Sequence, residues 1–223
     1  MTFRASAAFA MMPANQVGVA IQVTSRRRGL MHVGLLYEDR QGKAHLAHLK
    51  RDDVAVSEPA PNDQGFFWDD CAWLSRPNLN ALAETVALFI ELCARTREIP
   101  YGPNPPPEAF DAQGRYVCTD RRYGLTCATY VSAVLAGAGY PVVKFDTWQG
   151  RPDDETWWEM AAGYLPPARA EELEEVRIKF RLRPDEVAVA AAAEDRPLCF
   201  TQATDRSGPL RDILRRDPGS PNP

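Results

Sequence analysis

The chain has 223 residues, of which 45% are hydrophobic and 25% charged, so it can bury one core of ordinary size. Its formal net charge of −4 gives no excess of basic residues and argues against nucleic acid or an anionic membrane as a charge-driven partner. No apolar run approaches the roughly 18 residues of a transmembrane helix. We therefore expect one domain over residues 1–203, no nucleic-acid partner and no transmembrane segment.

The first residues and the cysteines narrow the class of protein further. The first residues, "MTFRASAAFAMMPANQ", reach Pro13 before a signal-peptide core can form, so we expect synthesis and folding in the cytoplasm. The cysteines are odd in number and lack CxxC spacing, which argues against a disulfide framework and a zinc ribbon: Cys71, Cys93, Cys118, Cys127 and Cys199. We expect no metal and no cofactor.

Taken in chain order, residues 17–23 and 31–37 are short β-branched and aliphatic runs that predict strands. The second run continues through "EDRQGK" into "AHLAHLK", which predicts a hairpin with Gly42 at the end of its loop. Residues 51–77 mix prolines, charges and aromatics, and we expect an irregular covering loop there.

Helical patterns dominate the rest of the chain. In 77–100, apolar residues at three- and four-residue steps predict a helix that Pro100 ends, and 101–117 is too rich in proline and glycine for regular structure. A second helix is predicted from Thr126, its N-cap, to stop signals at Gly137, Gly139 and Pro141. Acidic and alanine-rich helical stretches follow in 167–194, and we expect 204–223 to be a disordered tail.

The sequence "GLTCATYVSAVLAGAGYP" places Cys127 at the first turn of that second helix. Unpaired N–H groups and the helix dipole favour a thiolate there, so we expect a thiol pKa below the usual ~8.5. The same N–H groups could hold an oxyanion. The alternative is that Cys127 is a small packing residue at a helix start.

A catalytic thiolate needs an imidazole partner, and the three histidines of the chain, His32, His45 and His48, all fall in the predicted hairpin. A three-residue loop ending at Gly42 would pair residues whose numbers sum to 82, which puts His48 on the same face as His32. An even-numbered loop would put His45 there instead. We favour His48.

These segments resemble a known family. "HVGLLYEDRQGKAHLAHL" is similar to the histidine hairpin of NlpC-like papain-fold peptidases, and "TCATYVSAVLAGAGYPV" is similar to their nucleophile helix. His32 precedes Cys127 by 127 − 32 = 95 residues, the reverse of the usual order. That order resembles the circularly permuted branch, which includes lecithin:retinol acyltransferase-like proteins and some type VI secretion effectors.

The resemblance implies an α+β, permuted papain-like fold in which an antiparallel sheet packs against the helix that carries the nucleophile. It implies that Cys127 is the nucleophile, that His32 is the general base and that His48 orients His32. "IPYGPN" is similar to the segment in which a tyrosine borders the active site, so Tyr101 is a candidate oxyanion or positioning residue, with packing beside the proline loop as its alternative. Thr126 stands where the family commonly has aspartate.

The function that follows is a cysteine hydrolase that cleaves an amide bond through an acyl-enzyme, with stem peptides of bacterial peptidoglycan as the expected substrate. An export route independent of a signal peptide, with secretion machinery or an immunity protein as partner, is left open. One alternative is a thioester-forming acyltransferase or lipid-directed hydrolase, which an apolar groove would favour. Another is a non-catalytic binding or immunity-type module, in which Cys127 would be buried or out of reach of any histidine.

Overall fold

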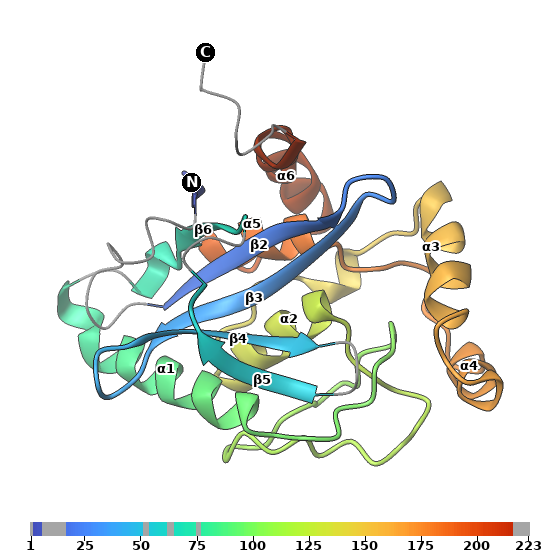
Figure 1. The fold of residues 1–223 in the computed structure, drawn as a ribbon, viewed down its shortest axis with the longest axis horizontal. Helices are drawn as coiled ribbons and strands as arrows, with labels where there is room; N and C mark the ends of the chain where they lie inside the picture. The colour runs from blue at the N-terminus through green and yellow to red at the C-terminus, as the bar shows by residue number, and fades with distance from the viewer. Residues whose placement is uncertain (1, 6–16, 51–53, 62–64, 75–76, 216–223) are drawn as a thin grey trace.

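The computed structural model describes residues 2–5, 17–50, 54–61, 65–74 and 77–215. Within them an antiparallel sheet of six strands, in the order β1-β6-β2-β3-β4-β5, is combined with six α-helices (Figure 1). The strands are β1 (Arg4–Ala5), β2 (Val17–Ser25), β3 (Leu30–Glu38), β4 (Ala44–Lys50), β5 (Val54–Pro59) and β6 (Phe67–Asp70). The helices are α1 (Asn80–Ala94), α2 (Cys127–Gly137), α3 (Pro152–Ala162), α4 (Pro167–Glu174), α5 (Pro184–Ala192) and α6 (Phe200–Arg215). The α+β class is therefore confirmed.

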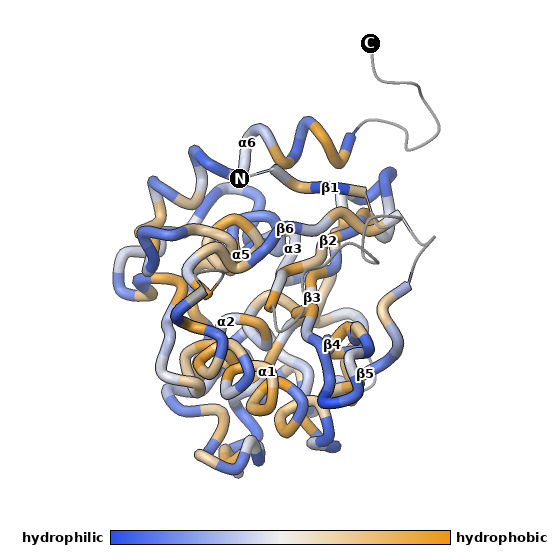
Figure 2. Tube along the Cα trace, turned by 90° about the vertical axis from the view of Figure 1, so that its left-hand side faces the viewer, coloured by the Kyte–Doolittle hydropathy of each residue, from blue (hydrophilic) through white to orange (hydrophobic). Residues whose placement is uncertain are grey.

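The sheet divides the molecule into two unequal layers because successive side chains of a strand point to opposite faces. Val33 and Leu35 of β3 belong to the main core, where α1, α2 and α5 cover one face of the sheet (Figure 1). Hydrophobic segments of these helices and of the strands meet there (Figure 2). Leu36 and Leu46 face the other way and form a smaller buried cluster with Trp68.

The hairpin of β3 and β4 has the predicted register. Leu35 pairs with Ala47 and Tyr37 with His45, and Gly42 has a φ of 75°, the left-handed conformation that its place in the loop requires. The pairing of β3 with β4 begins at Leu35 and Ala47, so the residues of β3 before Leu35 are paired with β2 alone.

Residues 51–77, expected to be an irregular loop, contain two strands instead. β5 pairs with β4 from His45 to Lys50, and β6 lies between β1 and β2. The prolines that argued against a strand are compatible with it, because Pro59 is the last residue of β5, an edge strand. Residues 51–53, 62–64 and 75–76 of this segment lie outside the described part of the chain.

The two predicted helices are present. Val86, Phe89 and Cys93 are buried on one face of α1, as their spacing predicted, although α1 ends at Ala94 rather than at Pro100. α2 begins at Cys127 and ends at Gly137. Residues 101–117 contain no helix or strand, only isolated bridges, which agrees with the predicted loop.

The C-terminal region is more ordered than predicted, since 204–215 belongs to α6 rather than to a disordered tail. Ala203, Ser207, Leu210 and Leu214 are buried at the four- and three-residue steps of a helix face, which packs against α5. A tail rich in charge can therefore fold because one stripe of it is apolar. Residues 216–223 lie outside the described part of the chain.

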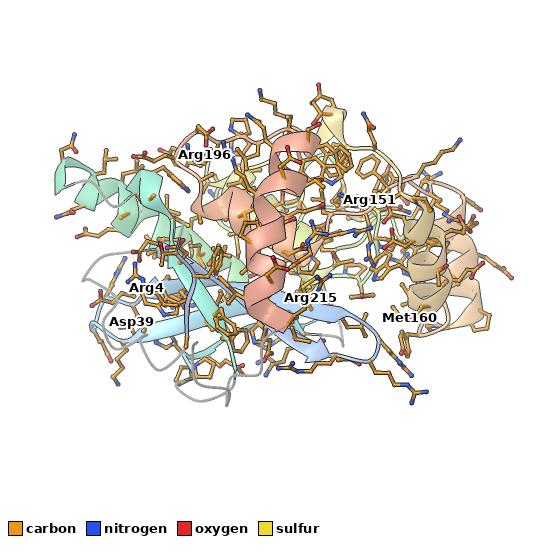
Figure 3. The ribbon with its side chains drawn as sticks, turned by 90° about the horizontal axis from the view of Figure 1, so that it is seen from above. Arg4, Asp39, Arg151, Met160, Arg196 and Arg215 are labelled. Atoms are coloured by element: carbon orange, nitrogen blue, oxygen red, sulfur yellow. The ribbon has the colours of Figure 1, made fainter. Side chains whose placement is uncertain are left out.

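α3 was not predicted from the sequence, and charge pairs anchor the segment at its start. The Arg151 guanidinium contacts Glu186 of α5 and lies 3.2 Å from the Thr204 hydroxyl of α6, and Figure 3 shows Arg151 between α6 and α3. Arg183 pairs with Asp153 at 2.5 Å. Because α3 carries residues that line the cavity described below, this network fixes one wall of the site.

Candidate functional site

The site is built around the first turn of α2. Thr126 is the N-cap: its hydroxyl accepts from the Thr129 amide at 3.3 Å, and the Thr129 hydroxyl accepts from the Thr126 amide at 2.7 Å. This capping box satisfies two of the amides at the start of the helix. The two amides between them, those of Cys127 and Ala128, lie near the Cys127 sulfur together with the Val33 amide of β3, and all three favour its ionised form. The thiol therefore has N–H groups around it from two elements.

The thiol is nevertheless not pre-ionised, so the expectation of a lowered pKa is wrong in direction. Burial raises the pKa of the Cys127 thiol above its ordinary value, and the amides of Val33, Ala128 and Cys127 only partly oppose the rise. The sequence argument counted the helix terminus and omitted the desolvation by the sheet against which the thiol packs. At neutral pH the resting residue is a neutral thiol.

A row of hydrogen-bonded side chains crosses β3, β4 and β5. His32 Nε2 lies 2.5 Å from His48 Nδ1, and His48 Nε2 lies 3.0 Å from Glu58 Oε1. Lys50 Nζ lies 2.7 Å from Glu58 Oε2, which completes the row at its exposed end. The predicted pairing of His32 with His48 rather than His45 is therefore present in the geometry.

Both imidazoles are neutral at pH 7. Burial, followed by repulsion from His48, lowers the pKa of His32 from 6.5 to about 4, and burial also lowers the pKa of His48. Burial alone would raise the pKa of Glu58, but Lys50 and His48 outweigh it and keep that pKa below its ordinary value. Glu58 is thus ionised at pH 7.

The charge on Glu58 determines which ring nitrogens carry protons. An ionised carboxylate only accepts, so His48 Nε2 must donate to Glu58 and His48 Nδ1 is left as an acceptor. His32 Nε2 then donates to His48, and Nδ1 of the neutral His32 ring has no proton. The row therefore leaves His32 with a basic nitrogen available for another proton.

Cys127 and one member of the histidine row, His32, line the same cavity but are not hydrogen-bonded. Cys127 and His32 both line a cavity of about 440 Å³ between the sheet, the start of α2 and α3. Both residues are described, and no hydrogen bond joins the sulfur to the ring: His32 interacts with His48, Glu58 and Lys50, and the sulfur interacts with backbone amides. His32 shares its strand face with Leu36, whereas the neighbouring Val33 points into the core beside α2.

The two alternative site residues are placed differently. Tyr101 lines the same cavity and pairs with Leu125, two residues before the cysteine. His45 is separate: its Nε2 lies 2.9 Å from Asp39 Oδ2, and its ring stacks on Tyr37. The register assigns His45 to the opposite face of β4 from His48, so it is not part of the row.

The remaining walls of the cavity are mostly apolar. Met31 comes from β3, Leu49 from β4, Trp157 and Met160 from α3, and Leu182 from the segment before α5. Met160 is labelled on α3 in Figure 3, at the edge of the molecule. No group of three or more His, Cys, Asp or Glu side chains in the described residues is arranged to hold a metal ion.

Sequence reasoning missed Glu58 and the cavity wall of α3. Glu58 sat in a segment assigned to a loop, and only the pairing of Glu58 with Leu46 across β4 and β5 puts it beside His48. Trp157 of α3 lines the cavity, whereas the neighbouring Trp158 is buried and donates to Glu174. Period-two spacing puts His48 and Lys50 on one face of β4, and it was the one sequence signal that the row extends beyond the two histidines.

No family model, curated protein or solved structure matches this chain. The resemblance to the permuted NlpC-like branch therefore stays a prediction. In the part of the chain that the structure describes, none of the helices has the length and hydrophobicity needed to cross a membrane.

Proposed function

We propose that the chain is a cysteine hydrolase that forms an acyl-enzyme on Cys127. One observation carries the proposal: a single cavity is lined by a thiol at a helix start, with backbone amides near its sulfur, and by a histidine whose hydrogen bonding leaves one ring nitrogen unprotonated. A nucleophile, an oxyanion site and a base are the three parts that acyl transfer needs. Tyr101, in the same cavity, is a candidate to position the substrate.

In the proposed reaction, His32 Nδ1 takes the thiol proton as the sulfur attacks the substrate carbonyl carbon. The carbonyl oxygen becomes an oxyanion that the amides of Cys127 and Ala128 stabilise. The intermediate collapses to a thioester as the leaving group departs with the proton from His32. Water then attacks the thioester, His32 takes a proton from it, and the acid is released as the sulfur recovers its proton.

Because the resting pair is neutral and not hydrogen-bonded, the mechanism is general-base catalysis rather than attack by a preformed thiolate. The proton transfer requires His32 Nδ1 to come within hydrogen-bonding distance of the sulfur, so the proposal includes a side-chain rearrangement when substrate binds. A pKa of about 4 leaves the His32 ring unprotonated at pH 7 but makes it a weak base, so the rearrangement must also raise that pKa.

The cavity walls favour an apolar acyl group over a peptidoglycan stem peptide. Met31, Trp157 and Leu182 offer contact to hydrocarbon, whereas a stem peptide would need hydrogen-bonding partners along its backbone. We therefore propose an ester, thioester or amide of an apolar acyl group as substrate. Cleavage of stem peptides remains the expectation from the family resemblance.

The first experiment is acylation by p-nitrophenyl octanoate, followed by peptide mass mapping. The proposal expects an octanoyl group on Cys127 of the wild type, with release of p-nitrophenolate. The Cys127→Ala variant should release none, and acylation of His32→Gln should be at least about tenfold slower. Cys118 and Cys199 are also partly exposed, so their labelling in the same sample serves as the background. Acylation of Cys127 no faster than theirs, or unchanged by His32→Gln, would refute the proposal.

Glu58 supplies a second test because it acts through His48 rather than on substrate. Glu58→Gln keeps the shape but removes the charge that dictates the proton positions, so we expect the rate of acylation to fall about tenfold and its pH profile to shift. Asp39→Asn is the matched control, since it removes a carboxylate from the other histidine pair, His45 and Asp39. An equal effect of both variants would count against the row as a catalytic unit.

One observation favours a second candidate, a non-catalytic binding module. The thiol pKa is raised and the sulfur has no hydrogen bond to a histidine, as that reading predicts. It expects no adduct on Cys127 above the background of Cys118 and Cys199, together with retained binding of apolar ligands in the same cavity. The acylation experiment therefore separates the two candidates directly.

A further inference from the structure

The cavity has an uneven distribution of charge. Among the described residues that line it there are two arginines, Arg28 and Arg181, and no aspartate or glutamate. A water-poor cleft lined by one sign of charge concentrates ligands of the opposite sign. The chain as a whole carries a net charge of −4, so this local excess of positive charge is not a consequence of overall composition.

Of the two arginines, Arg28 is the one whose charge is not balanced by a carboxylate among the described residues. Arg181 lies 3.4 Å from Asp154 and stacks on Trp157, so its charge is balanced behind the cavity wall. Arg28 donates to the Tyr164 hydroxyl at 2.5 Å, and among the described residues it forms no ion pair. A phenol hydroxyl orients the guanidinium without neutralising it.

The backbone holds Arg28 at the rim of the cavity. It lies in the turn between β2 and β3, where its amide donates to the Ser25 hydroxyl at 3.4 Å and Gly29 adopts a φ of 61°. The contact with Tyr164 joins this turn to the residues that follow α3, so it links the two sides of the cavity, sheet and helix. The apolar side chains of Met31 and Met160 line the same cavity as Arg28 and Cys127.

We propose that this cavity binds an amphiphilic anion: a hydrocarbon chain against Met31, Trp157 and Met160, with a carboxylate or phosphate group at the Arg28 guanidinium. Arg28 is then a specificity-determining residue. The inference rests on the proposed function because it concerns the same cavity. Binding of such a ligand does not, however, require the thiol to react. Burial of the chain supplies the affinity and Arg28 selects the charge.

The test is a binding measurement without chemistry. Isothermal titration with octanoate, octyl phosphate and octanamide compares two anions with an uncharged analogue of the same chain length. In the wild type we expect octanoate, octyl phosphate or both to bind about fivefold more tightly than octanamide at low salt. An exposed ion pair contributes up to about 1 kcal/mol, which corresponds to that factor. Added salt should reduce the difference because it screens that pair.

Arg28→Gln should remove the preference for the anion, so that its affinity approaches that of octanamide, and Arg28→Lys should restore part of it. Arg27→Gln is the matched control: Arg27 is the neighbouring arginine of the same turn but does not line the cavity, so its loss should leave the preference intact. Whether octanoate or octyl phosphate benefits more from Arg28 identifies a free acid or a phosphate headgroup as the source of the charge.

Three results would overturn the inference: equal affinity of anions and octanamide in the wild type, a preference that survives Arg28→Gln, or the absence of binding by any of the three probes. Cys127→Ala distinguishes this failure from failure of the proposed function. That variant should bind octanoate as the wild type does while it no longer forms the acyl adduct, so binding and chemistry are judged by separate measurements.

Discussion

The buried His32 should make the stability of the protein depend on pH, and His32→Gln should remove most of that dependence. The folded state holds the pKa of His32 at about 4, against 6.5 in a free chain. As pH falls below 6.5 the unfolded chain takes up a proton that the folded chain does not, so the free energy of unfolding decreases. The loss is complete once pH passes below about 4.

The magnitude follows from the size of the shift. A difference of about 2.5 pKa units at 1.36 kcal/mol per unit corresponds to about 3 kcal/mol of stability, present above pH 6.5 and lost on the way to pH 4. His48, whose pKa burial also lowers, contributes in the same direction and stays in the variant. Glutamine at position 32 can still donate to His48 Nδ1, which limits the packing cost of the change.

The assay is urea unfolding of the wild type and His32→Gln at several pH values between 7.5 and 4. The wild type should lose about 3 kcal/mol more than the variant over that range, and their difference at pH 7.5 reports the packing cost alone. Histidine NMR titration of the folded wild type should show the low pKa directly. Parallel pH profiles for the two proteins would refute the assignment of a buried neutral His32.

Two further predictions concern the frame around the site. Gly124→Ala should lower the free energy of unfolding in urea by about 2 kcal/mol or more, because a Cβ there would lie 2.5 Å from the Pro100 carbonyl oxygen. The backbone shift that relieves this clash would move Tyr101 away from Cys127. Gly163→Ala is the control: its Cβ meets nothing closer than 3.4 Å, so the free energy of unfolding should change by no more than about 0.5 kcal/mol. Arg211→Met should lower the free energy of unfolding by about 3 kcal/mol, because it leaves the fully buried Asp185 without the guanidinium 3.1 Å away. Arg215→Met removes an exposed ion pair with Asp212 and should change stability by less than about 0.5 kcal/mol. Equal losses in the two variants would contradict the reasoning.

Local signals in the sequence were sufficient for the elements that carry the proposed nucleophile and base. The stop signals after α2 and the N-cap Thr126 are short-range features, and they located the helix start at Cys127. The hairpin register followed from one glycine, because a left-handed residue at the end of a three-residue loop dictates which strand residues are opposite each other. That register put His32 and His48 together.

Features that depend on distant pairing were decided by the tertiary structure. β5 forms because β4 offers it an edge, and this pairing alone brings Glu58 to His48 and sets the proton positions in the row. α6 is ordered because its apolar stripe is buried against α5. Neither outcome is encoded in a window of a few residues.

The ionisation of the site was likewise beyond the sequence. Helix position alone favoured a thiolate at Cys127, and an isolated histidine would titrate near pH 6.5. In the folded protein both groups are neutral, because packing between the sheet and α2 removes water, and the cost of desolvation exceeds the stabilisation from nearby amides and charges. Sequence thus determined which groups meet in the cavity, while burial, a property of the whole fold, decided their charge.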